Sequence, residues 1–277
     1  MVSVSQDNLL KLALEDENKG NYDLAIQNLE EALSYGPSNK VVIKLCELYR
    51  KNKQEDQAYA LIKDQPDLFS DEKIFNEYCQ ILKVNHYFIE FCQLEKLLDR
   101  KIKINISPGS ESEQNKIMTG FRKKEQITQL DYQSLLKLNL INFENFSQSL
   151  LLDPSQNFAV RLALCEDLVR LNLEKTFKVW ILGKQKEFIP NNTPLLEKST
   201  VYTEVIGGIG DHFRNNPSQL PIMLGETNLI LGSLYPEIGD YIRNTDGFTS
   251  DLISYIQTGN GRTNQKLLEK IYKYLPK

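Results

Sequence analysis

The chain has 277 residues, of which 41% are hydrophobic and 25% are charged, and this composition excludes a disordered or collagen-like protein. The net charge is −4, with 33 basic residues interspersed among 37 acidic ones. We therefore expect no general attraction to nucleic acid or to an anionic membrane surface.

The beginning of the sequence shows no export signal. It lacks a basic start and an apolar core, and it carries Asp7, Glu15, Asp16 and Glu17. No stretch is long enough to span a bilayer. The four cysteines lie in apolar segments without CxxC spacing, which is typical of core residues in a reducing compartment. These features predict a cytoplasmic protein.

A helix-turn-helix unit is expected at the start of the chain. Gly20 permits a tight turn between the two helices, and Pro37 ends the second because proline has no N–H to donate. The expected core positions, which follow the helical period, are Leu9, Leu12, Ala13, Ala25, Leu29 and Ala32.

A second unit repeats this pattern and ends before Pro66. Its expected core positions are Val42, Leu45, Cys46, Tyr49, Ala58 and Ile62. Ala25 and Ala58 are 33 residues apart, which is close to the period of about 34 residues known from one class of helical repeat. Residues 70 to 99 keep the helical apolar period without the small residues, so we interpret them as a degenerate third pair.

This spacing resembles the tetratricopeptide repeat (TPR), in which small residues allow two helices to approach closely. The resemblance implies a right-handed superhelix of helix pairs. Asp16 departs from it, because the family usually has an aromatic residue at this position. The first repeat is therefore expected to pack less tightly or to be capped by the preceding chain.

The sequence changes character after Arg100. Lysine and isoleucine alternate as in a strand at the start of residues 101–112, and the rest of this segment has the composition of a linker. Short helices follow. Residues 150–168 resemble a HEAT-type helical repeat through Asp153, Pro154, Val160 and Arg161, and the resemblance implies that Asp153 and Arg161 tie adjacent units together.

A β-hairpin is predicted next. Phe177, Val179 and Ile181 would share one face, Trp180 and Leu182 the other, and Gly183 with Lys184 would close the turn. An amphipathic helix over residues 173–182 is the alternative. Further helices are predicted at residues 195–213, 220–234, 236–243, 251–257 and 264–274.

The predicted fold is therefore mainly α-helical, with TPR-type pairs that continue into a HEAT-like region and one small hairpin. The predicted divisions are residues 1–100 for the repeats, 101–112 for a linker, 113–190 for the HEAT-like helices and hairpin, and 191–277 for a C-terminal helical region. This order resembles that of TPR proteins of low-GC Gram-positive bacteria, and that resemblance implies no reaction.

Catalytic and metal-binding motifs are not evident. Gly207, Gly208 and Gly210 lack the spacing of a dinucleotide loop or a P-loop, which favours a helix turn or kink. Neither His86 nor His212 has a second histidine at helical spacing, and no recognised motif places a nucleophile near His212. We expect no cofactor, no metal ion and no enzymatic activity.

Function is therefore expected on a surface. In TPR arrays the first helices line a concave groove, and the chaperone-adaptor members hold a carboxylate there with lysine and asparagine at the positions of Leu10 and Leu14. Because both residues are apolar here, we do not expect that clamp. The expected partner-facing residues are Leu10, Leu14, Glu17, Asn18, Lys40, Ile43, Glu47, Arg50 and Lys51.

Such a surface suits an amphipathic helix or an extended apolar peptide. The alternative is that Leu10 and Leu14 are covered by the C-terminal half of the chain. The leading hypothesis is a scaffold or adaptor that binds a protein or peptide. A peptide-sensing regulator without its own DNA-binding domain, and an enzyme with a site in residues 190–277, are the alternatives.

Overall fold

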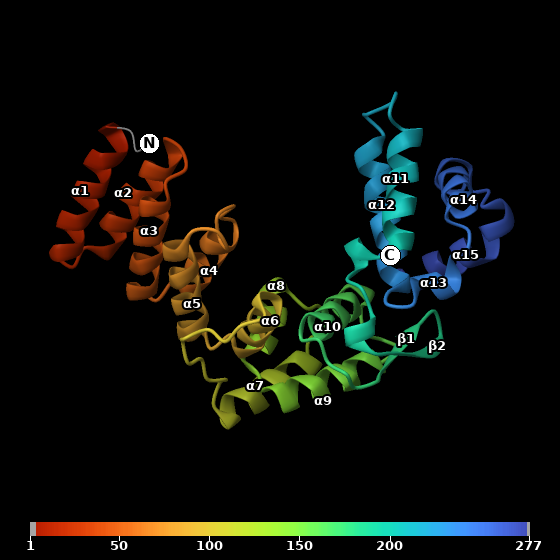
Figure 1. The fold of residues 1–277 in the computed structure, drawn as a ribbon, viewed down its shortest axis with the longest axis horizontal. Helices are drawn as coiled ribbons and strands as arrows, with labels where there is room; N and C mark the ends of the chain where they lie inside the picture. The colour runs from red at the N-terminus through yellow and green to blue at the C-terminus, as the bar shows by residue number, and fades with distance from the viewer. Residues whose placement is uncertain (1–3, 276–277) are drawn as a thin grey trace. The chain divides into compact units, whose positions relative to one another are not determined.

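The computed structural model describes residues 4–275, which form fifteen α-helices and one two-stranded antiparallel sheet (Figure 1). The mainly α-helical fold with one small hairpin is thus confirmed. Two compact units make up the chain, and both are discontinuous. The first runs up to Glu95 and adds Arg100–Ile117 and Gln133–Asn139, while the second comprises Lys96–Asp99, Met118–Tyr132 and the chain from Leu140 onward.

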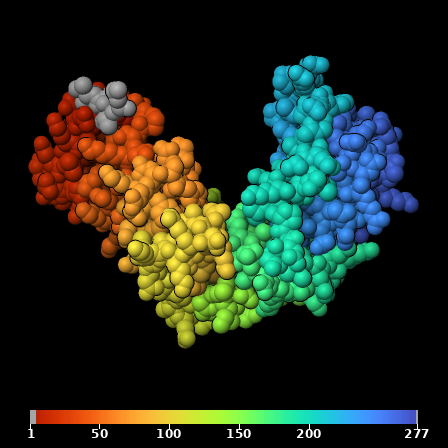
Figure 2. Space-filling view, in the orientation of Figure 1, coloured from red at the N-terminus to blue at the C-terminus, as the bar shows by residue number. Residues whose placement is uncertain are grey.

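The first five of the six N-terminal helices pack against one another in chain order (Figure 1), and their side chains form one continuous mass, red to orange in Figure 2. The helices are α1 (Val4–Asn18), α2 (Tyr22–Ser34), α3 (Asn39–Lys51), α4 (Glu55–Lys63), α5 (Glu72–Asn85) and α6 (Phe88–Leu98). Gly20 takes a φ of +78° in the turn between α1 and α2, a conformation that glycine adopts without strain. The predicted core positions of α2, α3 and α4 are all buried.

The predicted core face of α1 is wrong in part. Leu12 is 48% exposed, whereas Gln6, Leu10 and Ala13 form the buried stripe. Gln6 fixes this rotation, because its Nε2 donates to the carbonyls of Ala32 at 3.0 Å and Gly36 at 2.8 Å, at the end of α2. A buried amide that satisfies helix-terminal carbonyls adds nothing to the apolar period, so that period alone predicts a displaced stripe.

Asp16, which stands where the TPR pattern has an aromatic residue, makes polar contacts with the second helix instead. Its side chain accepts a hydrogen bond from Asn28 Nδ2 at 3.0 Å. Its carbonyl accepts one from the Asn21 backbone N–H at 2.9 Å. The first pair is therefore held by hydrogen bonds at the point where an aromatic ring was expected.

Residues 70 to 99 form two helices as predicted, α5 and α6; α5 packs against α3 and α4, and the Tyr78 hydroxyl of α5 donates to Glu90 of α6. Asp71 caps α5, since its side chain accepts hydrogen bonds from the backbone N–H groups of Lys73 and Ile74. His86 ends α5 in the left-handed conformation, and its Nδ1 lies 3.1 Å from the carbonyl oxygen of Ser107. The histidine therefore connects the turn between α5 and α6 to the segment after Arg100.

The strand-like segment at residues 101–110 forms neither strand nor helix. Its backbone does not pair with a neighbouring strand. One of its hydrogen bonds runs from the Gly109 N–H to the carbonyl oxygen of Lys137, at 2.8 Å. Gln114 holds the same region, because its Nε2 donates to Gly109 O and its Oε1 accepts from the Asn139 N–H. The predicted linker, residues 101–112, lies within a segment of the first unit.

The rest of the chain contains α7 to α15 and the hairpin. The elements are α7 (Glu111–Arg122), α8 (Gln129–Ser134), α9 (Leu140–Leu151), α10 (Phe158–Arg170), β1 (Phe177–Ile181), β2 (Lys184–Phe188), α11 (Thr200–His212), α12 (Leu220–Leu234), α13 (Ile238–Tyr241), α14 (Thr245–Thr258) and α15 (Gln265–Tyr274).

The hairpin is confirmed, with Phe177 paired to Phe188 and Ile181 to Lys184. Phe177, Val179 and Ile181 share a buried face, as predicted. Its two-residue turn is Leu182 and Gly183, both with positive φ, so Lys184 belongs to the second strand. Leu182 is buried in that turn and does not share a strand face with Trp180.

Helices α11, α12 and α14 form a second core (Figure 1). Buried Ile209, Phe213, Met223 and Ile253 meet there. The glycine-rich segment lies inside α11, and a Cβ at Gly208 would lie 3.0 Å from the Thr249 side chain, so this glycine lets α11 approach α14 closely. Among the described residues, no helix combines the length and apolarity of a membrane span.

Candidate functional site

The predicted partner-facing residues of α1 do not share one environment. Leu10 is only 4% exposed and belongs to the core, so its prediction as a contact residue is wrong. Leu14 is 40% exposed and Asn18 is exposed, while Glu17 is partly buried. The rotation of α1 set by Gln6 explains the difference, because it turns Leu10 inward and leaves Leu14 at the edge of the stripe.

On α3 the predicted residues lie on the face opposite the core. Lys40 and Lys51 are exposed, and Ile43, Glu47 and Arg50 are half-buried. Most of their charges are engaged in contacts with other side chains of the same unit. These charged groups are therefore less available for contacts with a partner.

An ion-pair network joins α1 to α3. Lys44 Nζ lies 2.8 Å from Glu17 and 3.0 Å from Glu47, and Lys51 Nζ lies 2.6 Å from Glu17. Burial alone would raise the pKa of Glu17, but hydrogen bonds from Lys44 and Lys51 outweigh it and lower that pKa. Lys44 was not among the predicted site residues, although it is the centre of the network.

A second ion pair joins α3 to α5. Arg50 donates to both carboxylate oxygens of Glu77, at 2.9 and 3.0 Å, and Glu77 is 6% exposed. Arg50 and Glu77 are 27 residues apart in the sequence, and Glu17 and Lys44 have the same separation. In the second pair the basic residue comes first and the acidic residue second. The same cross-repeat contact therefore recurs between successive first helices.

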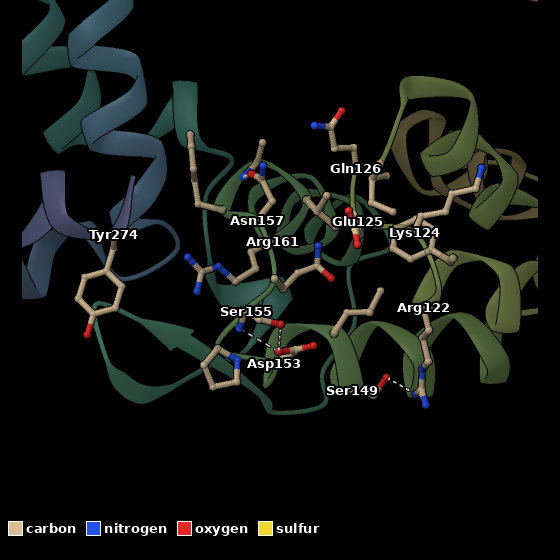
Figure 3. Close-up of a pocket in the computed structure, with 18 of the residues that line it drawn as sticks. Arg122, Lys124, Glu125, Gln126, Ser149, Asp153, Ser155, Asn157, Arg161 and Tyr274 are labelled. Atoms are coloured by element: carbon tan, nitrogen blue, oxygen red, sulfur yellow. Dashed lines mark hydrogen bonds between the residues drawn. The ribbon is translucent and has the colours of Figure 1, made fainter. Parts of the chain in front are cut away.

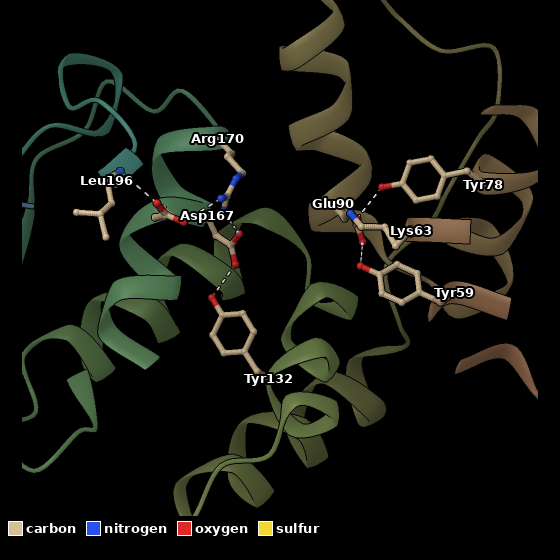
Figure 4. A network of polar contacts seen from close by, with 9 residues as sticks. Tyr59, Lys63, Tyr78, Glu90, Tyr132, Asp167, Arg170 and Leu196 are labelled. Carbon is tan, nitrogen blue, oxygen red and sulfur yellow. Dashed lines mark hydrogen bonds and ion pairs between the residues drawn. The ribbon is translucent and has the colours of Figure 1, made fainter. Parts of the chain in front are cut away.

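A third cluster, which no sequence pattern indicated, lies at Glu90 in α6 (Figure 4). Its buried carboxylate accepts hydrogen bonds from Tyr59 OH at 2.7 Å and Tyr78 OH at 2.6 Å, and it pairs with Lys63 at 2.7 Å. Burial is the main cause that raises the pKa of Tyr78 well above its usual range. These contacts tie α4, α5 and α6 together, which is a structural role.

The second unit holds a cavity of about 1000 Å³ (Figure 3). It is lined by the end of α7 with the loop that follows, the end of α9, the α9–α10 loop, the first turn of α10 and the end of α15. Figure 3 labels Arg122, Lys124, Glu125, Gln126, Ser149, Asp153, Ser155, Asn157, Arg161 and Tyr274 among its lining residues.

The HEAT resemblance implied a tie made by Asp153 and Arg161, and both side chains line this cavity. Asp153 accepts hydrogen bonds from the Ser155 backbone N–H and hydroxyl, which close its own turn and lower its pKa. Arg161 donates to the Trp180 carbonyl of β1. Arg161 thus connects α10 to the hairpin, whereas Asp153 acts locally.

Among residues 4–275, no three His, Cys, Asp or Glu side chains are grouped so that they could hold a metal ion. No disulfide joins the four cysteines, and three of them are buried. Comparisons of the chain with family models, with curated proteins and with solved structures return no match. The TPR and HEAT resemblances consequently remain predictions from the sequence.

Proposed function

We propose that this protein is a non-catalytic helical-repeat scaffold of the cytoplasm that binds a protein or peptide on the outer face of α1 and α3. The observation that supports this most directly is the recurring cross-repeat ion pair, Glu17 with Lys44 and Arg50 with Glu77. It joins three successive first helices, which is what a repeat array needs to present one continuous surface.

The proposed surface offers apolar contact with little net charge. Leu14 lies one turn before Glu17 on the same side of α1 and is 40% exposed. The charges of Glu17, Lys44, Glu47 and Lys51 are neutralised by one another. A partner with an apolar side chain at its centre, such as an amphipathic helix, would suit this surface better than a strongly charged one.

A comparison of two leucines on α1 tests the proposal. Leu14 and Leu12 are exposed to similar extents but lie about 160° apart around the helix axis. Proteins captured from the source cell by the wild-type chain would be compared with those captured by Leu14→Glu and Leu12→Glu. We expect a specific partner to be lost with Leu14→Glu, because a carboxylate is costly to desolvate against an apolar ligand, and kept with Leu12→Glu.

Circular dichroism of both variants controls for folding, and neither change should reduce helicity because both side chains are exposed. Equal capture by Leu14→Glu and the wild type would place the binding surface elsewhere. A wild-type chain that captures no specific partner would count against a scaffold, and a metabolite that co-purifies in stoichiometric amount would favour an enzyme.

A further inference from the structure

Two arginines on α10 have contrasting surroundings. Arg170 pairs with Glu166 at 2.9 Å and with Asp167 at 3.2 Å. These carboxylates raise its pKa, although burial acts in the opposite direction. Asp167 is in turn held by the Tyr132 hydroxyl at 2.6 Å (Figure 4). Arg170 is therefore a fully neutralised structural cation.

Arg161 is half-buried and has no such partner within the described chain. Its Nη1 donates to the Trp180 carbonyl, a neutral acceptor, and no carboxylate of residues 4–275 forms an ion pair with it. Burial is the main influence on its pKa and lowers it, because partial removal from water disfavours the charged form of the guanidinium. A desolvated guanidinium without a counter-ion indicates a place for an anionic group.

The cavity supplies the space for that group. Arg161 lines it together with neutral amide and hydroxyl side chains such as Asn157, Gln126 and Ser149. In Figure 3 the labelled residues form a band from Tyr274 past Arg161 to Arg122. The volume of about 1000 Å³ is at the upper end of the range for small-molecule pockets, so a ligand larger than a single ion fits.

We propose that this cavity binds a ligand that carries a carboxylate group, with Arg161 as its anchor. Because Nη1 is engaged by Trp180, the Nε and Nη2 N–H groups are the donors that a carboxylate would accept from, in the paired geometry that arginine favours. The neutral amides and hydroxyls would hydrogen-bond the rest of the ligand.

The charges around the cavity favour a monoanion over phosphate. Glu125 and Asp153 also line it and would repel a second negative charge. Lys124 is paired with Asp131, and Arg122, which donates to the Ser149 hydroxyl at 2.9 Å, is close enough to Asp153 for its charge to lower the pKa of that carboxyl. The carboxylate could come from a free organic acid or from the end of a peptide chain, and these two sources share the recognition chemistry.

Trp180 provides a reporter, since it is the single tryptophan of the sequence and its carbonyl contacts Arg161. The full chain would be titrated with a pool of acetylated tetrapeptides with free C-terminal carboxylates, the same pool as C-terminal amides, butyrate, and inorganic phosphate. Tryptophan fluorescence and calorimetry would be recorded. We expect saturable binding of the acid pool or of butyrate, and none of the amides.

The variant Arg161→Gln keeps a donor for the Trp180 carbonyl but removes the charge. It should bind the carboxylate probe about tenfold more weakly or worse, and Arg161→Lys should bind with an intermediate loss. Arg214→Gln, at an exposed position outside the cavity, should bind as the wild type does.

Saturation by the acid peptides alone would identify a peptide end as the source, and saturation by butyrate would identify a free acid. The proposal is overturned if no carboxylate probe binds, if the amides bind equally well, if phosphate alone binds, or if a folded Arg161→Gln binds unchanged. Should Arg161→Gln fail to fold, the comparison of acid and amide pools on the wild-type chain still tests whether the carboxylate is recognised.

Discussion

Glu77 is a carboxylate inside α5 whose ionised form is only partly supported by its surroundings. Burial raises its pKa to about 6, and the attraction and hydrogen bonds of Arg50 oppose this rise without cancelling it. The pair therefore connects α3 to α5 while leaving one partner poorly solvated. Buried ion pairs of this kind often fix geometry more than they stabilise.

This environment makes stability depend on pH in a defined direction. Between pH 4.5 and 6 the native state binds more protons at Glu77 than the unfolded state does, so the free energy of unfolding falls as pH rises. Its contribution should be about 1–2 kcal/mol. Urea unfolding of the wild type and Glu77→Gln at pH 4.5 and 6.5 measures it, and the variant should show the smaller fall.

Arg50→Gln serves as the opposing control. Without the guanidinium, the pKa of Glu77 should rise further, so the fall in stability should be larger than in the wild type and extend above pH 6. If both variants showed the wild-type slope, Glu77 would not be the group that titrates.

At the same scale, the sequence indicated small and apolar core residues better than buried polar ones. Ala25, Ala32 and Ala58 are fully buried as expected, because their spacing follows the helix period. Gln6 and Glu90 are buried too, yet their partners lie on other helices and no local pattern marks them. The error at Leu10 follows from the same cause.

At the scale of elements, regular helices with clear ends were predicted most closely. The predicted range 220–234 coincides with α12, whereas α14 begins at Thr245, ahead of the predicted residue 251. The start of α14 depends on Asn244, whose side chain accepts from the Gly247 N–H in a sequence that resembles a loop. The cavity was not predicted, because three stretches that lie far apart in the sequence form it.

Packing between α1 and α2 depends on the small side chain at Ala25. This residue has no exposed surface, and the two helices pack against each other. Ala25→Leu would force extra methyl groups into the contact and should lower the free energy of unfolding by about 1–3 kcal/mol. Gln27→Leu, at an exposed position of α2, should change it by less than about 0.5 kcal/mol.

Urea unfolding followed by circular dichroism would measure both variants against the wild type. An Ala25→Leu chain as stable as the wild type would show that the helices can separate at this point without loss. The helix register would then not be set by the alanine positions.

At the scale of the whole molecule, segments of the two units alternate along the sequence between residues 95 and 140. Arg100–Ile117 and Gln133–Asn139 belong to the first unit, and Met118–Tyr132 to the second. Ile106, Leu135 and Leu138 are almost fully buried. No single cut between residues 95 and 140 therefore leaves both units whole, although composition alone suggested a boundary near residue 100.

This arrangement predicts how fragments will behave. A fragment of residues 1–100 lacks two segments of the first unit, including the Ser107 carbonyl that lies 3.1 Å from His86 Nδ1 and the Ile102 N–H that donates to Glu95. A fragment of residues 1–139 keeps them. Because each buried isoleucine or leucine contributes roughly 1.5–3 kcal/mol, the short fragment should be less stable by several kcal/mol.

Thermal melting of the two fragments, followed by circular dichroism at 222 nm, would check this. We expect a single cooperative transition for residues 1–139 and a broader one at lower temperature for residues 1–100, because unsupported helix pairs lose cooperativity. The variant Leu135→Ala in the long fragment should shift its melting toward that of the short one, since it removes a fully buried side chain. Equal melting of both fragments would mean that residues 100–117 and 133–139 contribute nothing to the first unit, and its boundary would then lie near residue 100 after all.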